Sequence, residues 1–485
     1  MQNILIAGCF LFLFLVRFYR LGYHDFWFDE IWSTKSFPRS NWNAPLYWML
    51  MHLWVKLFGI SEFILRVPSA CLNYCSVILI YILGKKLFNK TTGLIAAIFM
   101  GLSPFHLWYA QEARDYSMVL FFSIASSGLF YLALNENKAK LWVFFVISSL
   151  LAFYTNYFFG FLLISQGIFL LLCKGRLNTR ALISFLIVGM GFSFYSGFFL
   201  EKFYYVREGF WVPNPHWQSF GITFENFLLG YNGSVFLYLA ADILVVVLLT
   251  SALVAVFKKH WHENETLFCW CMFLVPILMV FIFSQLYFSI YLDRALIIFT
   301  PYFYLILASG VKFLPKKLEK TILFIAIFLI SVSAYRYFND QLYPPLRHHL
   351  GVHIKKPIKP IVRLLETKVT NDDIVVYTNM AIIPSMEYYL HRNKKDFRSY
   401  YFYDPALSDE VWRRPNQESL FCVPFDKINK LLFRRLWIVC SNWERTGQLD
   451  ENSIRVKKWL DENFVLGFAK EIENVWIFSY AKNGT

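Results

Sequence analysis

The chain has 485 residues, of which 57% are hydrophobic and only 16% are charged, and its net charge is +14. A disordered chain is excluded, because disorder requires low hydrophobicity and high charge. A soluble domain, which carries about 25% charged residues, is also excluded, because with this composition it would expose large apolar patches. Positive charge suggests nucleic acid in a soluble protein, but basic residues also accumulate in the cytoplasmic loops of membrane proteins. Because the apolar residues form long runs, the sequence predicts a polytopic α-helical membrane protein with no nucleic-acid partner.

The first apolar run, Ile4 to Tyr19, is interpreted as a retained helix because no small-residue cleavage site follows it. The first outer loop, residues 20–65, is expected to hold interfacial helices, since its segment Pro45–Gly59 is amphipathic and too short to span a membrane. Residues 200–234 are expected to form a long loop with short re-entrant or interfacial helices. Ten further spans bring the expected total to about eleven. They lie near residues 67–84, 91–105, 116–134, 141–155, 158–173, 181–199, 235–257, 266–286, 293–311 and 320–338.

The basic residues predict the orientation of the chain. With the N-terminus in the cytoplasm, every second loop is cytoplasmic, and those loops contain many Lys and Arg residues and few acidic ones. Their basic residues are Lys85, Lys86, Lys90, Lys138, Lys140, Lys174, Arg176, Arg180, Lys258, Lys259, Lys312, Lys316, Lys317 and Lys320. Short loops rich in Lys and Arg face the cytoplasm, so we expect the N-terminus inside and the C-terminal region outside.

The composition changes after Phe338. Residues 339–485 contain no run long enough to span a membrane, and short β-type runs alternate with helical patterns, so we expect a small extracytoplasmic α/β domain that follows a transmembrane domain of residues 1–338. The expected strands are Ile374–Thr378, Ser419–Val423, Leu436–Cys440, Val465–Ala469 and Val475–Tyr480, and the expected helices are Pro360–Val369, Ile383–Leu390 and Asp450–Asn463. The basic run Arg347 to Lys359 links the two domains.

Six of the eight cysteines lie in or beside apolar runs and are expected to pack as small hydrophobes. Cys422 and Cys440 lie in the polar C-terminal region, where a disulfide is conceivable outside the cytoplasm. We favour free thiols, because two cysteines make no disulfide framework.

Three charged motifs fall in the expected outer loops. FWFDEIWS, Phe26 to Ser33, places the adjacent carboxylates of Asp29 and Glu30 among aromatic residues directly after the first span. It fits an interfacial aromatic anchor, but ionisable groups held among aromatics at a membrane surface favour a functional site.

The second motif, SPFHLWYAQEARDYS, covers Ser103 to Ser117. Its polar and charged residues are His106, Tyr109, Glu112, Arg114 and Asp115. The alternative is an ordinary loop at a helix start, with Asp115 as the N-cap. In the third motif, YLDRALIIFTP, Asp293 and Arg294 begin a span, and an Arg–Asp pair at a helix terminus is the alternative.

In this order the motifs resemble the GT-C membrane glycosyltransferases, in particular the bacterial group similar to protein O-mannosyltransferases and lipid A aminoarabinose transferases. The matching stretches are RLG…FWFDEIWS, APLYWMLMHLWVKLFGISEFILRVPSA, LGKKLF and LSPFHLWYAQEARDYSM, with a weaker match in YLDRALIIFTPYFYLILASG. The resemblance implies a GT-C fold in the bacterial cytoplasmic (inner) membrane. It also implies transfer of a sugar, with inversion, from a polyprenyl-phosphate carrier to an acceptor outside that membrane.

The resemblance implies roles for individual residues. Asp29 matches the acidic residue of the first outer loop, with Glu30 as its neighbour, and Arg114 and Asp115 match the charged cluster of the second. An acceptor hydroxyl needs a base, for which Asp29 is the candidate. The leaving phosphate needs positive charge, which the planar fork of Arg supplies. The candidates for phosphate binding are Arg114, Arg294 and Arg66, with Glu112, Asp115, His106 and Tyr109 in support.

No cofactor is firmly indicated. Asp29 and Glu30 could hold a divalent cation, although one acidic pair is a weak metal pattern. The aminoarabinose transferases carry a Glu-Lys pair before Pro-Pro, where this chain has Asn43-Ala44-Pro45, which argues against that specific function.

Three other classes of protein compete with the transferase. A transporter or flippase of lipid-linked glycans predicts charges at mid-membrane and repeated halves, whereas here the charges cluster at the outer surface. A polysaccharide polymerase or ligase predicts one large outer loop with the main chemistry, whereas here the acids lie early. A purely structural anchor does not need eleven spans. The expected partners are membrane lipid, a polyprenyl-phosphate-linked sugar and an acceptor that is a lipid, a surface glycan or a protein.

Overall fold

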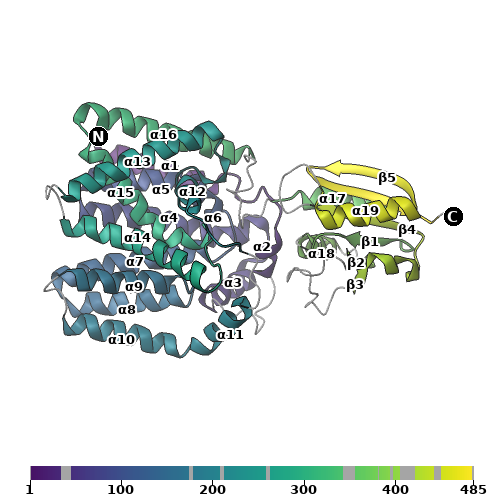
Figure 1. The fold of residues 1–485 in the computed structure, drawn as a ribbon, viewed down its shortest axis with the longest axis horizontal. Coiled ribbons are helices and arrows are strands. Elements are labelled where there is room, and N and C mark those ends of the chain that lie inside the picture. Colours follow the sequence, from purple (N-terminus) through teal and green to yellow (C-terminus); the bar gives the residue numbers. More distant parts are fainter. Residues whose placement is uncertain are drawn as a thin grey trace. The chain divides into compact units, whose positions relative to one another are not determined.

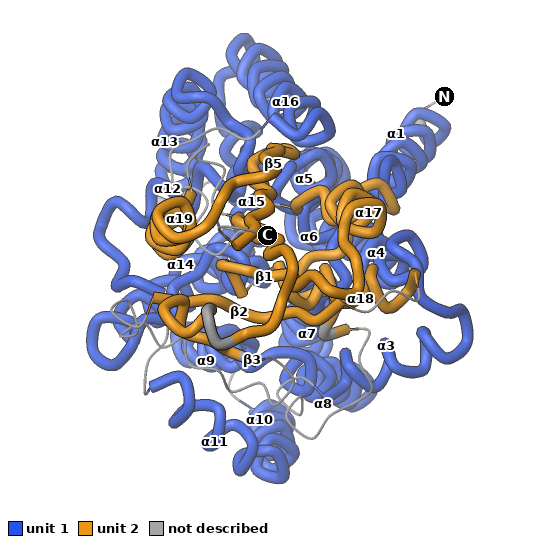
Figure 2. Tube along the Cα trace, turned by 90° about the vertical axis from the view of Figure 1, so that its right-hand side faces the viewer, with its two compact units in different colours: residues 1–21, 36–351 blue, residues 22–35, 352–485 orange. Residues whose placement is uncertain are grey.

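The computed structural model describes residues 2–33, 45–173, 178–207, 212–257, 263–341, 355–380, 382–393, 397–404, 421–441 and 449–482. The chain forms two compact units, residues 1–21 with 36–351 and residues 22–35 with 352–485 (Figure 2). Several residues named above lie outside the described part of the chain. They are Asn43, Ala44, Lys174, Arg176, Lys258, Lys259, the run 347–354 and the residues 419–420.

The described part of the first unit is helical (Figure 1). In chain order its helices are α1 (Gln2–Phe18), α3 (Pro45–Phe58), α4 (Glu62–Leu87), α5 (Lys90–Leu102), α6 (Pro104–Ala110), α7 (Tyr116–Glu136), α8 (Ala139–Phe153), α9 (Phe159–Leu172), α10 (Thr179–Ser193), α11 (Ser196–Arg207), α12 (Gln218–Leu229), η2 (Gly230–Asn232), α13 (Val235–Phe257), α14 (Glu263–Leu286), η3 (Ala295–Phe299), α15 (Thr300–Phe313) and α16 (Lys316–Phe338).

Among the described residues, six helical segments are long and apolar enough to cross a membrane: α4, α7, most of α13, α14, η3 with α15, and α16. Two bent pairs, α5 with α6 and α10 with α11, raise the number to eight if each pair is one span. The shorter apolar helices α1, α8 and α9 occupy the other three expected positions. The total of eleven crossings therefore stays a prediction, while six to eight are supported by length and composition.

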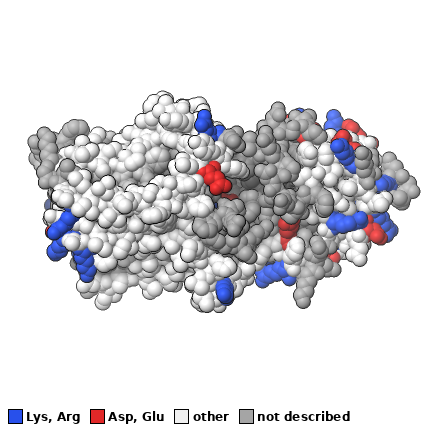
Figure 3. All heavy atoms as spheres, turned by 90° about the horizontal axis from the view of Figure 1, so that it is seen from below, with Lys and Arg blue, Asp and Glu red and all other residues white. Residues whose placement is uncertain are grey.

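The surface of the helical unit fits a membrane environment. In Figure 3 few charged residues are seen along its side, and Lys and Arg gather at its left-hand end. Helix α3 carries large exposed apolar side chains, including Met49 at 58%, Leu53 at 51% and Leu57 at 65%. An amphipathic helix with such a face is stabilised at the boundary between headgroups and acyl chains, which fits the interfacial position expected for this segment.

Local sequence explains how α5 gives way to α6. Helix α5 begins where the Asn89 side chain accepts hydrogen bonds from the backbone of Thr91 and Thr92. It ends at Ser103, because Pro104 has no N–H with which to continue the ladder, and α6 leaves at an angle of 62°. The Ser103 hydroxyl donates to the carbonyl oxygen of Phe227 in α12 at 2.8 Å. The bend therefore directs α6, all of whose residues are buried, toward α12.

A buried arginine joins the C-terminal ends of α1 and α5 to the middle of α4. The Arg17 side chain is fully buried, and its Nε donates to Oδ1 of Asn73 in α4 at 2.9 Å. Its Nη1 donates to the carbonyl oxygens of Leu13 in α1 (2.8 Å) and Gly101 in α5 (3.1 Å). A charge within an apolar bundle is costly unless protein groups replace its hydration. These bonds therefore fix the C-terminal ends of α1 and α5 against α4. The sequence did not indicate this arrangement.

The second unit contains α2 (Phe28–Trp32) and a six-stranded mixed sheet in the order β3-β2-β1-β4-β6-β5 (Figure 1). The pairings β3–β2, β2–β1 and β1–β4 are parallel, whereas β6 runs antiparallel to both β4 and β5. The remaining elements are α17 (Ile358–Lys368), β1 (Ile374–Tyr377), α18 (Ile383–Arg392), β2 (Ser399–Tyr403), β3 (Phe421–Pro424), η7 (Phe425–Lys430), β4 (Arg435–Ser441), α19 (Glu451–Asn463), β5 (Val465–Ile472) and β6 (Val475–Ala481).

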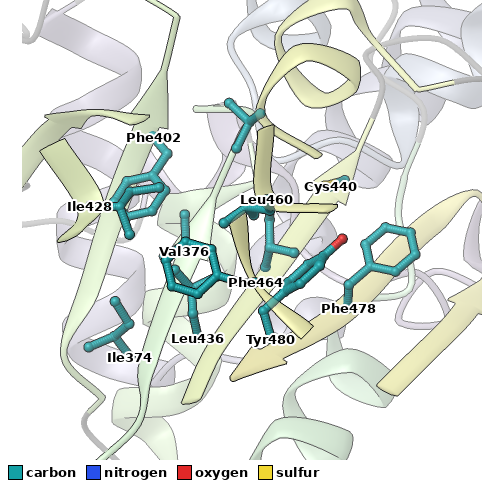
Figure 4. Close-up of a cluster of buried hydrophobic side chains, with 12 residues drawn as sticks. Ile374, Val376, Phe402, Ile428, Leu436, Cys440, Leu460, Phe464, Phe478 and Tyr480 are labelled. Atoms are coloured by element: carbon teal, nitrogen blue, oxygen red, sulfur yellow. The ribbon is translucent and has the colours of Figure 1, made fainter. Parts of the chain in front are cut away.

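The core of this unit lies between the sheet and α19 (Figure 4). Ile374 and Val376 of β1 and Leu436 of β4 are fully buried, and they cluster with Val456 and Leu460 of α19. A buried central strand of four apolar residues is typical of a parallel sheet that is covered by helices. The extracytoplasmic placement of this unit stays a prediction.

The sheet order explains why Cys422 and Cys440 are free thiols. Cys422 lies in β3 and Cys440 in β4, with β2 and β1 between them. Three strand spacings amount to about 14 Å, about twice the Cα separation that a disulfide tolerates. Burial raises the pKa of Cys440 to about 12, which keeps its thiol protonated and unreactive.

Asp373, just before β1, gives the second unit a predicted pH dependence. Burial raises the pKa of Asp373, but hydrogen bonds from Arg435 and Thr370 outweigh this effect and leave the pKa below its usual value. The Arg435 Nη2 lies 2.8 Å from Asp373 Oδ2. Because the folded-state pKa is depressed, the stabilisation is present above the unfolded pKa of about 3.9 and is lost as pH falls through the folded value.

We expect Asp373→Asn to lower the melting temperature of the full chain clearly at pH 7 and much less at pH 3, where the wild type has begun to lose the same interaction. Thermal unfolding at both pH values measures the difference. Glu462→Gln, on the exposed surface of α19, is the matched control and should leave both melting temperatures unchanged. An equal loss at the two pH values for Asp373→Asn would contradict the assignment.

Candidate functional site

The second motif covers α6, the turn that follows it and the first two residues of α7. In α6, the indole N–H of Trp108 donates to Oε1 of Glu112 at 2.8 Å. The hydroxyl oxygens of Tyr109 and of Tyr231 in η2 lie 2.6 Å apart, and Ser117 donates to the carbonyl oxygen of Tyr109. Both tyrosines are buried. This short bond ties the second motif to the segment that follows α12.

The third motif is held by α12. Asp293 accepts hydrogen bonds from the Thr223 hydroxyl at Oδ1 and from the Asn226 amide at Oδ2, each at 2.6 Å. Thr223 also lies 3.1 Å from the hydroxyl of Tyr291. Thr223 and Asn226 are three residues apart and therefore share one face of the helix. The carboxylate of Asp293 thus fixes the loop from which Arg294 projects.

Electrostatics show that these two motifs meet around Tyr231. Burial raises the pKa of Tyr231 well above its usual value, and the negative charge of Asp293 raises it further. The hydrogen bond with Tyr109 lowers this pKa, Glu112 raises it, and the positive charge of Arg294 lowers it. Charges act on a buried group most strongly at short range. Glu112, Asp293 and Arg294, which come from sequence-distant loops, therefore each lie close enough to Tyr231 to shift its pKa.

Arg114 and Asp115 lie in the same turn but have different neighbours. The Arg114 guanidinium carbon lies 5.8 Å from the ring centroid of Trp48 in α3, a cation–π arrangement. The backbone carbonyl oxygen of Arg114 accepts a hydrogen bond from the Ser69 hydroxyl of α4. Asp115 accepts from the Asn156 amide at 2.9 Å and makes no side-chain cap to α7. Asp115 does occupy the N-cap position of α7, and its backbone carbonyl accepts from Val119, but its carboxylate is directed to Asn156 and does not cap the helix.

Arg66 and His106 have structural contacts within the bundle. Arg66 is buried, and its Nη1 donates to the carbonyl oxygen of Leu21, just after α1. His106 Nε2 lies 2.8 Å from the hydroxyl oxygen of Thr300. Because Thr300 donates its proton to Ile297, we assign the hydrogen on Nε2 of His106 as the donor. His106 thus links α6 to the start of α15.

Asp29 and Glu30 lie in α2, in the second unit, and their environments differ. Glu30 is fully buried, and its Oε2 accepts a long hydrogen bond from the backbone N–H of Trp27 at 3.4 Å, as in a capping box. Asp29 is half-buried. The convergence of Asp29 with Arg114 in one cavity stays a prediction.

Within the described ranges, no group of three or more His, Cys, Asp or Glu side chains is arranged to hold a metal ion. Oxygen-ligated cations such as Ca²⁺ need six to eight ligands. A cation bound by Asp29 and Glu30 would therefore need ligands from water, substrate or other residues.

Sequence reasoning did not identify several residues of this region. They are Trp48, Asn156, Thr223, Asn226 and Tyr231. The spacing of Thr223 and Asn226, three residues apart in α12, is the one signal that could have found two of them, because polar residues on one face of a buried helix need partners. No local sequence pattern marks Trp48, Asn156 or Tyr231 as residues of this region.

We expect Asp293→Asn to destabilise the first unit by about 1–3 kcal/mol, because an amide in place of the carboxylate weakens both bonds to α12 and points a donor at the Asn226 donor. Thermal unfolding of the detergent-solubilised chain measures the loss. Glu201→Gln, at an exposed position of α11, is the control. A melting temperature of Asp293→Asn equal to that of the control would contradict the role given to Asp293.

Comparison with known proteins gives two kinds of match. Residues 43–198 match the family of dolichyl-phosphate-mannose-protein mannosyltransferases. A protein of Aquifex aeolicus (strain VF5) that bears the name "Uncharacterized protein" is 27% identical over 173 residues, or 32% of this chain and 35% of that protein. "Putative mannosyltransferase YkcB" of Bacillus subtilis (strain 168) is 24% identical over 129 residues, or 26% of this chain and 18% of that protein. The chain thus matches about a third or less of the length of these curated relatives.

Solved structures share the fold over almost the whole chain. ArnT from Cupriavidus metallidurans, in the apo state, is 12% identical with a TM-score of 0.59, and the match covers 99% of this chain and 97% of that chain. The same enzyme bound to undecaprenyl phosphate gives the same TM-score. The apo oligosaccharyltransferase of Archaeoglobus fulgidus is 11% identical with a TM-score of 0.53, covering 99% of this chain and 74% of that chain. The family match and the shared fold together confirm the resemblance to the GT-C superfamily of membrane glycosyltransferases.

Proposed function

We propose that the protein is an inverting glycosyltransferase that moves a sugar from a polyprenyl-phosphate donor to an acceptor hydroxyl on the outer side of the bacterial inner membrane. The observation that carries this proposal is the meeting of Arg294, Glu112 and Asp293 around the Tyr109–Tyr231 pair, within a fold shared with an ArnT that binds undecaprenyl phosphate. The matched family and the Bacillus relative are both named for mannose transfer. A mannosyl donor is therefore the first to test among hexoses and pentoses.

In the proposed reaction, the acceptor oxygen forms a bond to the anomeric carbon of the sugar while the bond from that carbon to the phosphate oxygen breaks. Asp29 takes the proton of the acceptor hydroxyl as the bond forms. Its neighbour Glu30 is buried and accepts from the backbone of Trp27, which leaves Asp29 as the better base. Attack from the side opposite the leaving group inverts the configuration at this carbon.

The leaving polyprenyl phosphate needs positive charge and no general acid. Arg114 and Arg294 are proposed to bind it, because a guanidinium meets two phosphate oxygens at once. Glu112, Asp115 and Tyr109 are proposed to hold these arginines and their loops in place. Arg66 donates to the carbonyl oxygen of Leu21 and is assigned a supporting part at the base of the first loop.

The acceptor class is left to experiment, since a lipid, a surface glycan or a protein would each offer a hydroxyl. A polymerase or ligase of lipid-linked glycans would use the same donor chemistry, whereas a flippase would move the lipid-linked sugar without breaking the anomeric bond. Mass spectrometry of the purified protein incubated with polyprenyl-phosphate sugars separates sugar transfer from flipping, and the mass of the glycosylated product separates a transferase from a polymerase or ligase. Release of free polyprenyl phosphate supports a transferase, and an intact donor supports a flippase.

The orientation in the membrane is proposed from the basic loops. Lys85 and Lys86 end α4, and Lys316, Lys317 and Lys320 begin α16. If these positions are cytoplasmic, the N-terminus is cytoplasmic and the residues after α16 are outside. We expect topology reporters fused after Lys86 and after Asp340 to report opposite sides of the membrane. The same side for both would overturn the proposed arrangement.

Mutation can separate the proposed role of Asp29 as the base from the proposed role of Arg114 in binding the phosphate. Asp29→Asn keeps the volume and removes the proton acceptor, so we expect turnover to fall by about 10²- to 10⁴-fold with donor binding little changed. Arg114→Ala removes a charged phosphate contact worth about 1.5–3 kcal/mol, so donor binding should weaken together with the rate. Steady-state kinetics with the donor, and binding of polyprenyl phosphate alone, measure the two effects.

Glu201→Gln on α11 serves as the control and should keep wild-type kinetics. Near-wild-type turnover of Asp29→Asn would show that Asp29 only anchors its loop. Loss of wild-type activity in a chelator, with partial rescue of Asp29→Asn by excess divalent cation, would instead show that Asp29 holds a metal.

A further inference from the structure

The second unit joins two segments that are far apart in sequence. Residues 22–35, which carry Asp29, form one compact unit with residues 352–485. Within it, the segment before α2 contacts α17 and α18, elements that begin more than 300 positions later. The α/β unit is therefore physically connected to the loop in which the proposed base lies.

An ion pair makes the first of these contacts. Both carboxylate oxygens of Asp25 face Lys359, near the start of α17: the Lys359 backbone N–H donates to Oδ2 at 2.8 Å, and Nζ lies 3.1 Å from Oδ1. The Asp25 side chain is 8% exposed and that of Lys359 is 36% exposed. A carboxylate at a helix N-terminus is also favoured by the helix dipole. Asp25 is thus held by charge and by backbone geometry together.

An aromatic contact lies beside the ion pair. The backbone N–H of Phe26 donates to the hydroxyl oxygen of Tyr389 in α18 at 2.9 Å, and the Phe26 side chain is 1% exposed. The Phe26 ring meets Tyr388 edge-on, with centroids 5.4 Å apart, and lies nearly parallel to Tyr389 at 6.4 Å. The Lys359 ammonium lies 5.4 Å from the centroid of Tyr389, so the same lysine joins both contacts.

We infer that Asp25, Phe26, Lys359 and Tyr389 form a clasp through which the α/β unit positions the catalytic loop. This inference rests on the proposed function, because it assigns the clasp to the base Asp29. Helix α2 begins at Phe28, two residues after Phe26, with Trp27 as its N-cap and Glu30 closing the capping box. The orientation of Asp29 is therefore coupled to the position of Phe26 through one short, capped helical turn.

Positioning of this kind has a kinetic consequence. A base must lie within hydrogen-bond reach of the proton that it removes, and a displacement of about 1 Å can lower the rate about 100-fold. The residues of the clasp are positioning residues and not catalytic ones, since they act through Asp29. A merely structural clasp would stabilise the α/β unit without altering the turnover of the folded enzyme.

The test uses the full chain in lipid nanodiscs, with a polyprenyl-phosphate mannose as donor probe. Lys359→Ala removes the ammonium and keeps the backbone N–H, and Tyr389→Phe removes the hydroxyl acceptor and keeps the ring. Lys359→Arg preserves the charge and serves as the conservative variant. Arg363→Ala, an exposed cation on the same helix α17, is the matched control. The readouts are kcat, the KM for the donor and hydrogen exchange of the peptide that spans residues 22–33.

We expect Lys359→Ala and Tyr389→Phe each to raise hydrogen exchange in residues 22–33 by about tenfold, the effect of losing one charge-assisted or buried bond. The same variants should lower kcat by about ten- to a hundredfold, with the donor KM within about twofold of wild type. Lys359→Arg should recover most of the turnover, and Arg363→Ala should behave as wild type.

The outcomes separate the clasp from the proposed function. Unchanged exchange and unchanged kcat in both clasp variants, with Asp29→Asn inactive, would overturn the clasp and leave the transferase standing. Raised exchange with unchanged kcat would show a structural contact only and would also overturn the positioning role. Full turnover of Asp29→Asn would overturn the assignment of the base, whatever the clasp variants show.

Discussion

The cost of placing a charged group inside an apolar helix bundle is the constraint on which this structure depends. Arg17 meets it with bonds to two carbonyl oxygens and to the Asn73 amide, so that α1, α4 and α5 must come together at one point. Gln111 extends this junction, because its amide donates to the carbonyl oxygens of Arg17 and Tyr19 and accepts from the hydroxyl of Tyr337 in α16. Without these partners each group would be buried at a cost of several kcal/mol.

The same constraint places the two charged motifs of the first unit. The Arg17–Gln111 junction lies directly before Glu112 in the chain, and so it fixes where the second motif leaves α6. On the other side, Asp293 can be buried only because Thr223 and Asn226 present donors from α12. Partners for buried charge thus define the positions of Glu112 and Arg294. The rigidity that the proposed phosphate site needs follows from the hydrogen bonds that make it possible to bury these charges.

What the sequence could predict was local or periodic. Apolar runs indicated the helices, the motifs in order indicated the superfamily, and the ranges of β1, β3, β4, β5 and β6 overlap the expected strands. What it could not predict were partners across long separations: Tyr231 for Tyr109, Asn156 for Asp115 and Lys359 for Asp25. Each is a single polar residue with no local pattern, and a single sequence read by itself carries no signal of pairing. Strand β2, the aromatic run Ser399–Tyr403, was missed because it shows no alternation of polar and apolar residues.

Two adjacent carboxylates in one short helix can have different environments when one of them caps the helix and the other does not. In α2, Glu30 turns back to the N–H of its own N-cap residue and is fully buried, whereas Asp29 remains half-buried on another face of the turn. Neighbouring acids take different roles when their environments differ, and here the difference arises from the capping geometry of a five-residue helix. Such a short helix has little stability of its own. Its geometry must therefore come from tertiary contacts, which for the two residues preceding its N-cap are the bonds of Asp25 to α17 and the contacts of Phe26 with α18.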